Sequence, residues 1–220
     1  MTAEDIKHSP QRINVSIPIG KTIDSIIVSF KETTPYFKNH ITKFTHKALN
    51  EEKLTQEFVA LLRRKTIDLP FLIGQEKADV YHNSGGRVDF YFYWKEEMET
   101  TESFFDVEAK RLTDKFPKNR KKEYVIGENK NGGIERFKIE KHGKGISQCG
   151  IVGFIEDLTT DYWLKTINGW IIELSQTNDN WFEDEILFDP TDSDNYCCSF
   201  SNAKRLNSDS VLLHHFWIVL

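Results

Sequence analysis

The sequence predicts an α/β protein. Three observations favour this class: an amphipathic helical pattern over residues 50–65, two segments dense in strand-forming residues over 87–94 and 103–110, and an apolar strand candidate over 210–220. A chain of 220 residues is long enough for one sizeable core, and neither an internal repeat nor a low-complexity linker divides it. We therefore expect residues 1–220 to form a single domain.

The clearest predicted helix covers residues 50–65. Asn50 is a suitable N-cap and is followed by two glutamates, whereas Arg63, Arg64 and Lys65 lie in the last turn, which suits the helix dipole. Apolar residues recur along one face of this helix: Leu54, Phe58, Leu61 and Leu62. Glu57 lies inside that stripe. Because burying an unpaired carboxylate is expensive, we expect Glu57 to have a partner.

Two strands are predicted behind a turn signal, Asn-Ser-Gly-Gly at 83–86. In the first strand, 87–94, the apolar residues share one face, and Asp89 lies on the other face with two tyrosines. In the second strand, 103–110, Asp106, Glu108 and Lys110 lie opposite the apolar face. The charged segment between them is typical of a hairpin connection. The simplest topology is an antiparallel pair that places Asp89 near Glu108.

The other segments carry weaker patterns. Residues 13–30 are rich in β-branched residues and predict one or two strands, after which Pro35 interrupts the chain. Residues 112–133 form a long polar, lysine-rich connection, a kind of segment that is usually functional or mobile. Residues 134–155 predict helical segments, although Gly143 and Gly145 weaken a single unbroken helix. The acidic C-terminal part predicts further strands, with 210–220 the best candidate.

Composition narrows the class of protein. The hydrophobic fraction is 39% and the charged fraction 29%, an ordinary globular balance. No stretch approaches the roughly 20 apolar residues that cross a bilayer, and no secretory signal is readable, so no membrane partner is expected. The chain has three cysteines, Cys149, Cys197 and Cys198, of which two are adjacent. An odd set with an adjacent pair favours a reduced, cytoplasmic protein.

The net charge of −5 hides an asymmetry along the chain. Residues 110–144 hold twelve Lys or Arg against five Asp or Glu, whereas residues 145–220 hold three basic and twelve acidic residues. The overall charge therefore argues only against indiscriminate binding of polyanions. A local basic patch can still attract phosphates, with an affinity that weakens as salt rises. The alternative is an ordinary solvated surface.

The residues that can carry chemistry are Asp89 and, after eighteen intervening residues, Glu108, Ala109 and Lys110. Two carboxylates on adjacent strands make a hard-oxygen site suited to Mg²⁺ or Mn²⁺, and the carbonyl of Ala109 can be a third ligand. Lys110 shares a strand face with Glu108, where an ammonium can hold the attacking water or stabilise charge on a phosphate. Glu57 could orient that water or help to hold a second ion.

The same residues have a structural interpretation. An Asp on one strand and Glu-x-Lys on the next often form a solvated face with a cross-strand ion pair. The context favours the catalytic interpretation, because the strand is hydrophobic up to Val107 and a basic segment follows it directly. Asp106 is either an extra ligand or an ordinary solvated carboxylate, and the latter is the simpler interpretation.

At these residues the chain resembles a known family. Residues 86–90 (GRVDF) followed by 105–112 (FDVEAKRL) are similar to the core motif of the PD-(D/E)xK nuclease superfamily. The resemblance covers a core region of about residues 50–157 and implies a mixed central β-sheet flanked by helices, the restriction-endonuclease-like fold. It also implies metal ligation by Asp89 and Glu108, a catalytic Lys110 and a supporting Glu57. The motif is short and degenerate, so its specificity is moderate.

The chain departs from the superfamily pattern in two places. Val88 stands where a proline often precedes the first Asp, a replacement that the superfamily tolerates. The exonuclease-like branch carries Gln-x-x-x-Tyr on the helix after the Lys, but here Gln148 is followed at that spacing by Val152. The resemblance therefore favours an endonuclease over an exonuclease.

Basic residues near the motif are candidates for binding nucleic acid. Four of them recur at near-helical spacing and could grip a duplex backbone: Arg136, Lys138, Lys141 and Lys144. The alternative is an exposed amphipathic helix face. Arg111 either touches a phosphate or pairs with Asp114.

Three hypotheses follow. The first is a metal-dependent nuclease acting on DNA rather than RNA, an effector of defence against foreign DNA by family analogy alone. The second is a catalytically silent nucleic-acid-binding module. The third is a subunit that docks on a partner such as a helicase or a sensor through its aromatic, acidic C-terminal half. A homodimer would suit cutting of both strands of a duplex.

Overall fold

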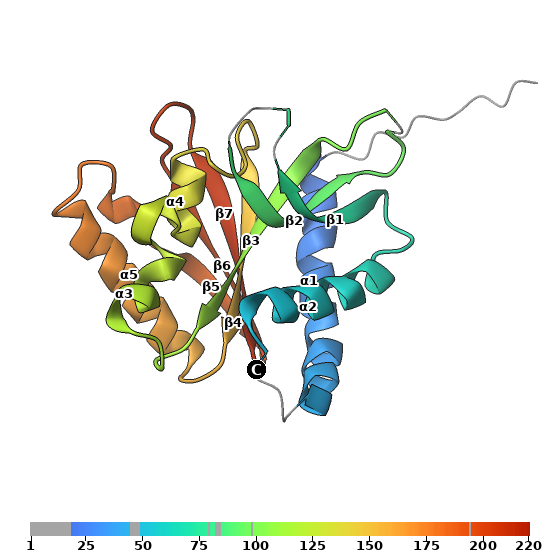
Figure 1. Cartoon of the computed structure of the whole chain (residues 1–220), viewed down its shortest axis with the longest axis horizontal. Helices are drawn as coiled ribbons and strands as arrows, with labels where there is room; N and C mark the ends of the chain where they lie inside the picture. The colour runs from blue at the N-terminus through green and yellow to red at the C-terminus, as the bar shows by residue number, and fades with distance from the viewer. Residues whose placement is uncertain (1–18, 45–48, 79, 82–84, 98, 194) are drawn as a thin grey trace, which may run out of the picture.

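The computed structural model describes residues 19–44, 49–78, 80–81, 85–97, 99–193 and 195–220. These residues form an α/β architecture in which one seven-stranded sheet lies between two layers of helices (Figure 1). The strand order in the sheet is β1-β2-β3-β4-β7-β6-β5. The expected α/β class with a mixed sheet flanked by helices is therefore confirmed.

The helices and strands follow one another in groups along the chain, with three consecutive strands after α2 and three more after η4. The strands are β1 (Phe71–Ala78), β2 (Arg87–Trp94), β3 (Ser103–Leu112), β4 (Gln148–Ile155), β5 (Phe188–Ser193), β6 (Tyr196–Ala203) and β7 (Val211–Val219). The α-helices are α1 (Ile19–Ile41), α2 (Glu51–Lys65), α3 (Lys118–Lys121), α4 (Gly133–Lys138) and α5 (Thr160–Ser175). Short 3-10 helices are η1 (Thr42–Phe44), η2 (Lys122–Tyr124), η3 (Glu128–Lys130) and η4 (Glu183–Glu185).

The sheet is parallel in its centre and antiparallel at its sides. β3, β4 and β7 pair in parallel, whereas β1 and β2 on one side and β6 and β5 on the other are antiparallel additions. On one face α1 and α2 pack over a core that includes Phe30, Phe58 and Phe90. On the other face α4, α5 and η2 pack over a second core that includes Trp163 and Trp217. β3 and β4 are therefore buried on both faces.

Several predicted elements are confirmed. The helix over 50–65 is α2, and the side chain of Asn50 caps it by accepting a hydrogen bond from Lys53 N at 3.0 Å. The strands over 87–94 and 103–110 are β2 and β3, and they pair antiparallel, with Phe90 opposite Val107. The strand expected over 210–220 is β7. The turn residues Asn83 and Ser84 lie outside the described residues.

The strand prediction for residues 13–30 is wrong wherever the structure describes them, because residues from 19 onward belong to α1, and 13–18 lie outside the described residues. Pro35 lies inside this helix. The buried residues of α1 recur every three or four positions, as in Ile23, Ile26, Phe30 and Phe37. Packing of that face on the sheet outweighs the weak preference of β-branched residues for strands.

The helical prediction for residues 134–155 is correct only at its start. α4 ends at Lys138, and residues from Gln148 onward form β4, which is a central strand with parallel neighbours on both sides. A strand buried on both faces is apolar without alternation, so its pattern resembles that of a buried helix. Gly150 lets Phe105 and Phe216 approach, since a Cβ there would meet each ring at 3.0 Å.

Two further expectations concern membranes and cysteines. Within the described ranges, no helix is long and apolar enough to cross a bilayer. The three cysteines are all buried and unbridged.

Candidate active site

The candidate site lies at the edge of β3, where its pairing with β2 ends. The antiparallel register runs from Ser103 opposite Tyr93 to Val107 opposite Phe90, whereas β3 stays paired with β4 as far as Leu112. Two carboxylates accept hydrogen bonds from β3 backbone N–H groups beyond that point. Asp89 Oδ2 accepts from Ala109 N at 2.7 Å, and Glu51 Oε2 accepts from Arg111 N at 3.1 Å. The two carboxylates therefore replace a neighbouring strand along this edge.

Glu108 lies at the centre of the site, with no exposed side-chain surface. Its Oε1 accepts hydrogen bonds from Lys110 Nζ at 2.6 Å and from Arg136 Nη1, and its Oε2 lies 3.1 Å from His142 Nδ1. Burial alone would raise the pKa of Glu108, but Lys110, His142 and Arg136 together lower it to about 2. Glu108 is therefore a buried, ionised carboxylate.

Lys110 pairs with two acidic side chains and feels the charge of a third. Its Nζ lies 2.6 Å from Glu108 Oε1 and 3.6 Å from Glu51 Oε1. Burial acts to lower the pKa of Lys110, but the charges of Glu108, Glu51 and Asp89 outweigh it and raise the pKa above its usual range. Lys110 is therefore a cation, which suits stabilisation of negative charge and excludes the role of a general base.

Asp89 is partly buried and lies near the carboxylate of Glu108. Burial, followed by the repulsion of Glu108, raises the pKa of Asp89 to about 8, although Lys110 and the hydrogen bond from Ala109 N partly offset this. Two acids that repel each other in a buried site are a common feature of functional sites. At neutral pH Asp89 therefore tends to hold a proton, which a divalent cation would displace on binding.

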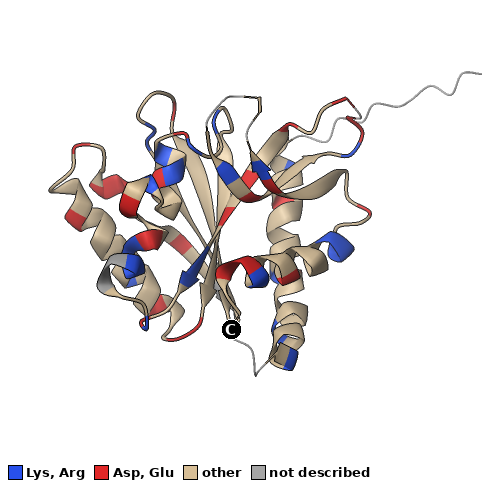
Figure 2. Ribbon diagram, viewed as in Figure 1, with Lys and Arg blue, Asp and Glu red and all other residues tan. Residues whose placement is uncertain are grey.

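The helix carboxylate at this site is Glu51, not the predicted Glu57. Glu57 lies six residues further along α2 and pairs with His40 Nε2 at 2.6 Å, with 40% of its side chain exposed. The expectation that Glu57 has a partner is confirmed, but the structure does not bring it to Asp89 and Glu108. Figure 2 shows the acidic N-terminal end of α2 directed at the half of β3 where acidic and basic residues follow each other.

The sequence alone does not mark Glu51 as a site residue. An acidic residue directly after an N-cap is already explained by the helix dipole, so its position does not indicate a further partner. The signal that could have found it is the end of the helix itself. A side chain in the first turn can reach past the helix to a neighbouring strand, whereas one in the apolar stripe points at the core.

The predicted basic residues separate into different environments. Arg136 reaches Glu108 from α4, whose start packs tightly on Lys110: a Cβ on Gly133 would meet Tyr124 O at 2.8 Å and Lys110 Cγ at 3.4 Å. Lys138, two residues on, is 2% exposed and pairs with Glu185. It does not belong to an exposed basic face, and that prediction is corrected, because the same short helix turns Lys138 into the second core.

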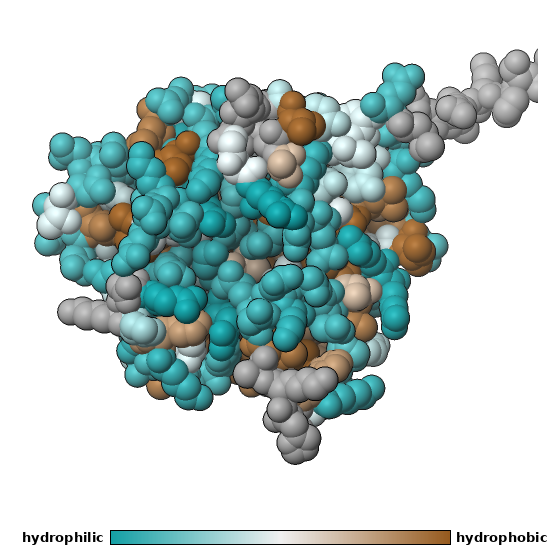
Figure 3. All heavy atoms as spheres, in the orientation of Figure 1, coloured by the Kyte–Doolittle hydropathy of each residue, from teal (hydrophilic) through white to brown (hydrophobic). Residues whose placement is uncertain are grey.

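The other basic candidates lie nearer the surface. Arg111 makes a two-pronged ion pair with Glu156, with Nη2 at 2.8 Å from Oε2, so of its two predicted partners Asp114 is wrong and a phosphate stays a prediction. Lys141 Nζ donates to Asn131 Oδ1 at 3.2 Å, and Lys144 is exposed. The face shown in Figure 3 is mostly hydrophilic, with hydrophobic residues in small separate groups.

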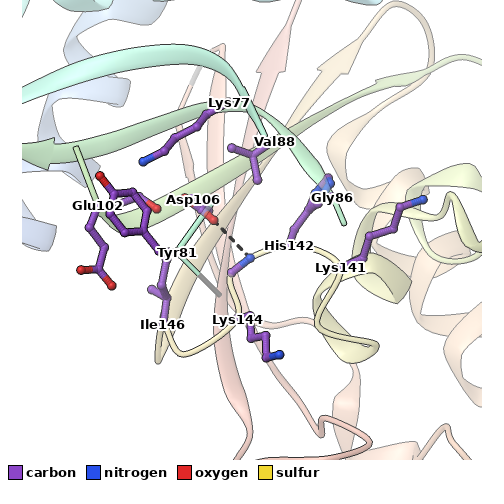
Figure 4. Close-up of a pocket in the computed structure, with 12 residues that line it drawn as sticks. Lys77, Tyr81, Gly86, Val88, Glu102, Asp106, Lys141, His142, Lys144 and Ile146 are labelled. Carbon is purple, nitrogen blue, oxygen red and sulfur yellow. Dashed lines mark hydrogen bonds between the residues drawn. The ribbon is translucent and has the colours of Figure 1, made fainter. Parts of the chain in front are cut away.

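A pocket adjoins the site along β3. Its lining includes Lys77, Tyr81, Asp106, Lys141 and His142 (Figure 4). Asp106 is not the solvated carboxylate that the sequence favoured: it is buried, accepts a hydrogen bond from Gly143 N at 3.1 Å, and burial raises its pKa. Since His142 contacts Glu108 and also lines this pocket, the pocket and the site share a wall.

The donor atoms fit one divalent ion with oxygen ligands. Asp89 and Glu108 supply carboxylates on neighbouring strands, and the carbonyl of Ala109 points to the same edge as its N–H, since both groups of a strand residue share an edge. Mg²⁺ usually takes one or two carboxylates and keeps several waters. In the described part of the chain, no three His, Cys, Asp or Glu side chains already converge as a ligand set. The fit therefore rests on two carboxylates and one carbonyl.

Comparison of the chain with protein-family models, with curated proteins and with solved structures found no match. The functional argument therefore depends on the residues of this chain and their geometry.

Proposed function

We propose that this chain is a divalent-cation-dependent nuclease of the PD-(D/E)xK type, with the restriction-endonuclease-like fold, that hydrolyses phosphodiester bonds in DNA. The observation that carries the proposal is the convergence of Asp89, Glu108 and Lys110 at the edge of β3, joined by Glu51 from α2. Lys110 contacts Glu108 and lies near Glu51. Asp89 accepts a hydrogen bond from the backbone N–H of Ala109, which lies between Glu108 and Lys110.

Each residue has a role in this proposal. Asp89, Glu108 and the carbonyl of Ala109 would hold the ion, which supplies charge neutralisation of the phosphate and activation of a water molecule. Lys110 holds the attacking water or stabilises the charge that develops on the phosphate, because it stays protonated among three acids. Glu51 fixes the position of Lys110 and the β3 backbone through its two contacts.

The test is cleavage of circular DNA, linear DNA and RNA in the presence of Mg²⁺ or EDTA. Wild type is compared with Lys110→Ala and Asp89→Ala, and with Lys165→Ala and Asp161→Ala as matched controls from an exposed ion pair on α5. We expect Mg²⁺-dependent cutting of DNA that the two site variants reduce by about 10²- to 10³-fold and the controls retain. Unchanged cutting by pure, folded Lys110→Ala would refute the assignment.

A second candidate is a nucleic-acid-binding module without catalysis. The observation that favours it is the environment of Glu108, whose Oε1 accepts hydrogen bonds from Lys110 and Arg136 and whose Oε2 lies 3.1 Å from His142 Nδ1. A carboxylate with three such neighbours is neutralised without a metal ion. Binding of DNA without cleavage under any divalent ion would favour this candidate over the nuclease.

A further inference from the structure

Arg136 engages one of the two carboxylate oxygens that Glu108 could offer to the proposed ion. Its Nη1 donates to Glu108 Oε1, and its Nη2 donates to Asn131 Oδ1 at 3.3 Å in the exposed loop before α4. The side chain of Arg136 is 19% exposed, whereas that of Glu108 has no exposed surface. Arg136 therefore joins the buried acid to the molecular surface.

We propose that Arg136 blocks the metal site in the free protein and that a phosphate group of the nucleic-acid backbone removes this block. We call this arrangement of Arg136 on Glu108 the latch. In the free protein Arg136 neutralises Glu108 and competes with a divalent ion for Oε1. When a phosphate binds the guanidinium, Oε1 becomes accessible to the ion. This inference rests on the proposed nuclease function and adds the regulation of its site.

The exchange leaves no buried charge without a partner. A buried carboxylate that loses its cation is strongly destabilised, so Arg136 leaves Glu108 readily only if another cation replaces it. A guanidinium in turn needs an anion, and its planar fork of donors matches the oxygens of a phosphate. Substrate and ion together satisfy both groups, whereas either alone satisfies one.

Arg136 is better placed for this exchange than the other two neighbours of Glu108. His142 is 1% exposed, and Lys110 has a second acid, Glu51, within 3.6 Å. Arg136 Nε is buried and has no hydrogen bond to any described residue, so the guanidinium is not fully satisfied where it lies. Arg136 is also the most exposed of the three neighbours of Glu108, so a phosphate can reach it most easily.

The decisive measurement is Mn²⁺ binding to the free protein by calorimetry, without nucleic acid and without turnover. We expect Arg136→Gln to bind Mn²⁺ on the order of tenfold more tightly than wild type, which is a typical size for coupling between two sites. The same variant should bind a short DNA duplex more weakly in EDTA. Lys141→Gln is the matched control. Lys141 donates to the same Asn131 Oδ1 as Arg136, and its substitution removes one positive charge without touching a partner of Glu108.

Three more variants secure the interpretation. Arg136→Met keeps the aliphatic stem without the charge and should reproduce the gain in Mn²⁺ affinity. Asn131→Ala removes the outer contact of Arg136 at an exposed position and should give a smaller gain. Adding Glu108→Gln to Arg136→Gln should abolish the gain.

The outcomes separate the latch from the nuclease. Unchanged or weaker Mn²⁺ binding by folded Arg136→Gln and Arg136→Met overturns the latch, even if wild type cuts DNA. A gain of equal size in Lys141→Gln also overturns it, because the effect would then be general electrostatics. If neither wild type nor Arg136→Gln binds Mn²⁺ and wild type does not cut, the proposed function fails together with the latch.

Discussion

Two buried lysine–carboxylate pairs lie on the same face of the sheet and differ in how they are completed. Lys138 pairs with Glu185, and the remaining bonds of both go to backbone: Nζ donates to Lys204 O at 3.0 Å, and Glu185 accepts from Lys204 N at 2.7 Å and Phe182 N at 3.0 Å. Lys110 pairs with Glu108, but the other neighbours of Glu108 are side chains, Arg136 and His142.

The difference separates a structural pair from a site that can change partners. Backbone groups cannot leave, so the partners of Lys138 and Glu185 are fixed. Side chains can rotate away, and two further acids, Asp89 and Glu51, lie near Lys110. Burial of a charged pair is therefore weak evidence for function, whereas exchangeable partners and several acids at one place are stronger evidence.

The largest expected difference between the two lysine–carboxylate pairs is in the rate of DNA cleavage. Lys110→Met and Lys138→Met each remove a buried ammonium and keep an apolar stem. We expect Lys110→Met to reduce the rate of DNA cleavage by about 10²- to 10³-fold, because it removes charge at the reacting phosphate. Lys138→Met, measured by the same rate at a temperature where it is folded, should cut within a few-fold of wild type. Equal losses in both variants would break the distinction between the two pairs.

The second effect is on stability, and here we expect the larger loss at the Lys138–Glu185 pair. We expect Glu185→Ala to lower the free energy of unfolding by about 3–5 kcal/mol, because it leaves Lys138 buried without its anion. Denaturant unfolding followed by circular dichroism measures this loss. The double variant Glu185→Ala/Lys138→Met should recover part of it. A double variant no more stable than Glu185→Ala would show that the pair does not stabilise by charge compensation.

The sequence could predict what depends on near neighbours along the chain. α2 contains its own N-cap and apolar stripe, and the hairpin of β2 and β3 follows from alternation and a turn. Asp89, Glu108 and Lys110 lie on those two strands, so their meeting needed only the antiparallel pairing.

The predictions that failed depend on contacts between segments that are far apart in the sequence. Glu51 and Glu57 are both acidic positions on one helix, and only the docking of α2 against β3 decides which of them reaches Lys110. Arg136 and Lys138 are two residues apart, and only the position of α4 turns one to the site and the other into the core. β4 has no alternation because both of its faces are covered.

His215 is a third buried polar group, and it differs from the two pairs because it carries no charge at neutral pH. His215 Nδ1 and Tyr124 Oη are 2.8 Å apart, and His215 Nε2 lies 2.8 Å from Ser201 Oγ. Burial, and then the neighbouring His214, lowers the pKa of His215 from 6.5 to about 3. Above pH 6.5 the residue is neutral in both states, and as pH falls below 6.5 only the unfolded state takes up the proton, so stability is lost between pH 6.5 and 3.

We expect His215 to account for about 2 kcal/mol of stability lost between pH 7 and pH 5, from 1.36 kcal/mol for each pH unit below 6.5. His215→Gln keeps a polar side chain without this proton uptake. Unfolding by denaturant at both pH values should therefore show a loss about 2 kcal/mol smaller in the variant than in wild type. Equal losses in the two proteins would contradict the buried neutral histidine.

The smallest expected effect is a gain in stability at the candidate site. Asn at position 89 can still accept the hydrogen bond from Ala109 N, but it has no carboxyl group whose ionisation is disfavoured by burial and by Glu108. In EDTA at pH 7 we expect Asp89→Asn to raise the free energy of unfolding by about 1 kcal/mol, because Asn avoids the cost of placing a carboxyl group there. Denaturant unfolding measures the difference.

Mg²⁺ should reverse that order. A ligand that binds only the folded state stabilises it, so Mg²⁺ should raise the unfolding free energy of wild type and leave Asp89→Asn almost unchanged. Asp106→Asn is the matched control, since Asp106 is an acid with a raised pKa on the neighbouring strand β3 but lies outside the pair that would hold the ion. If Asp89→Asn is less stable than wild type without Mg²⁺, the fold does not disfavour the carboxyl group of Asp89, and Asp89 is a stabilising residue like the Lys138–Glu185 pair.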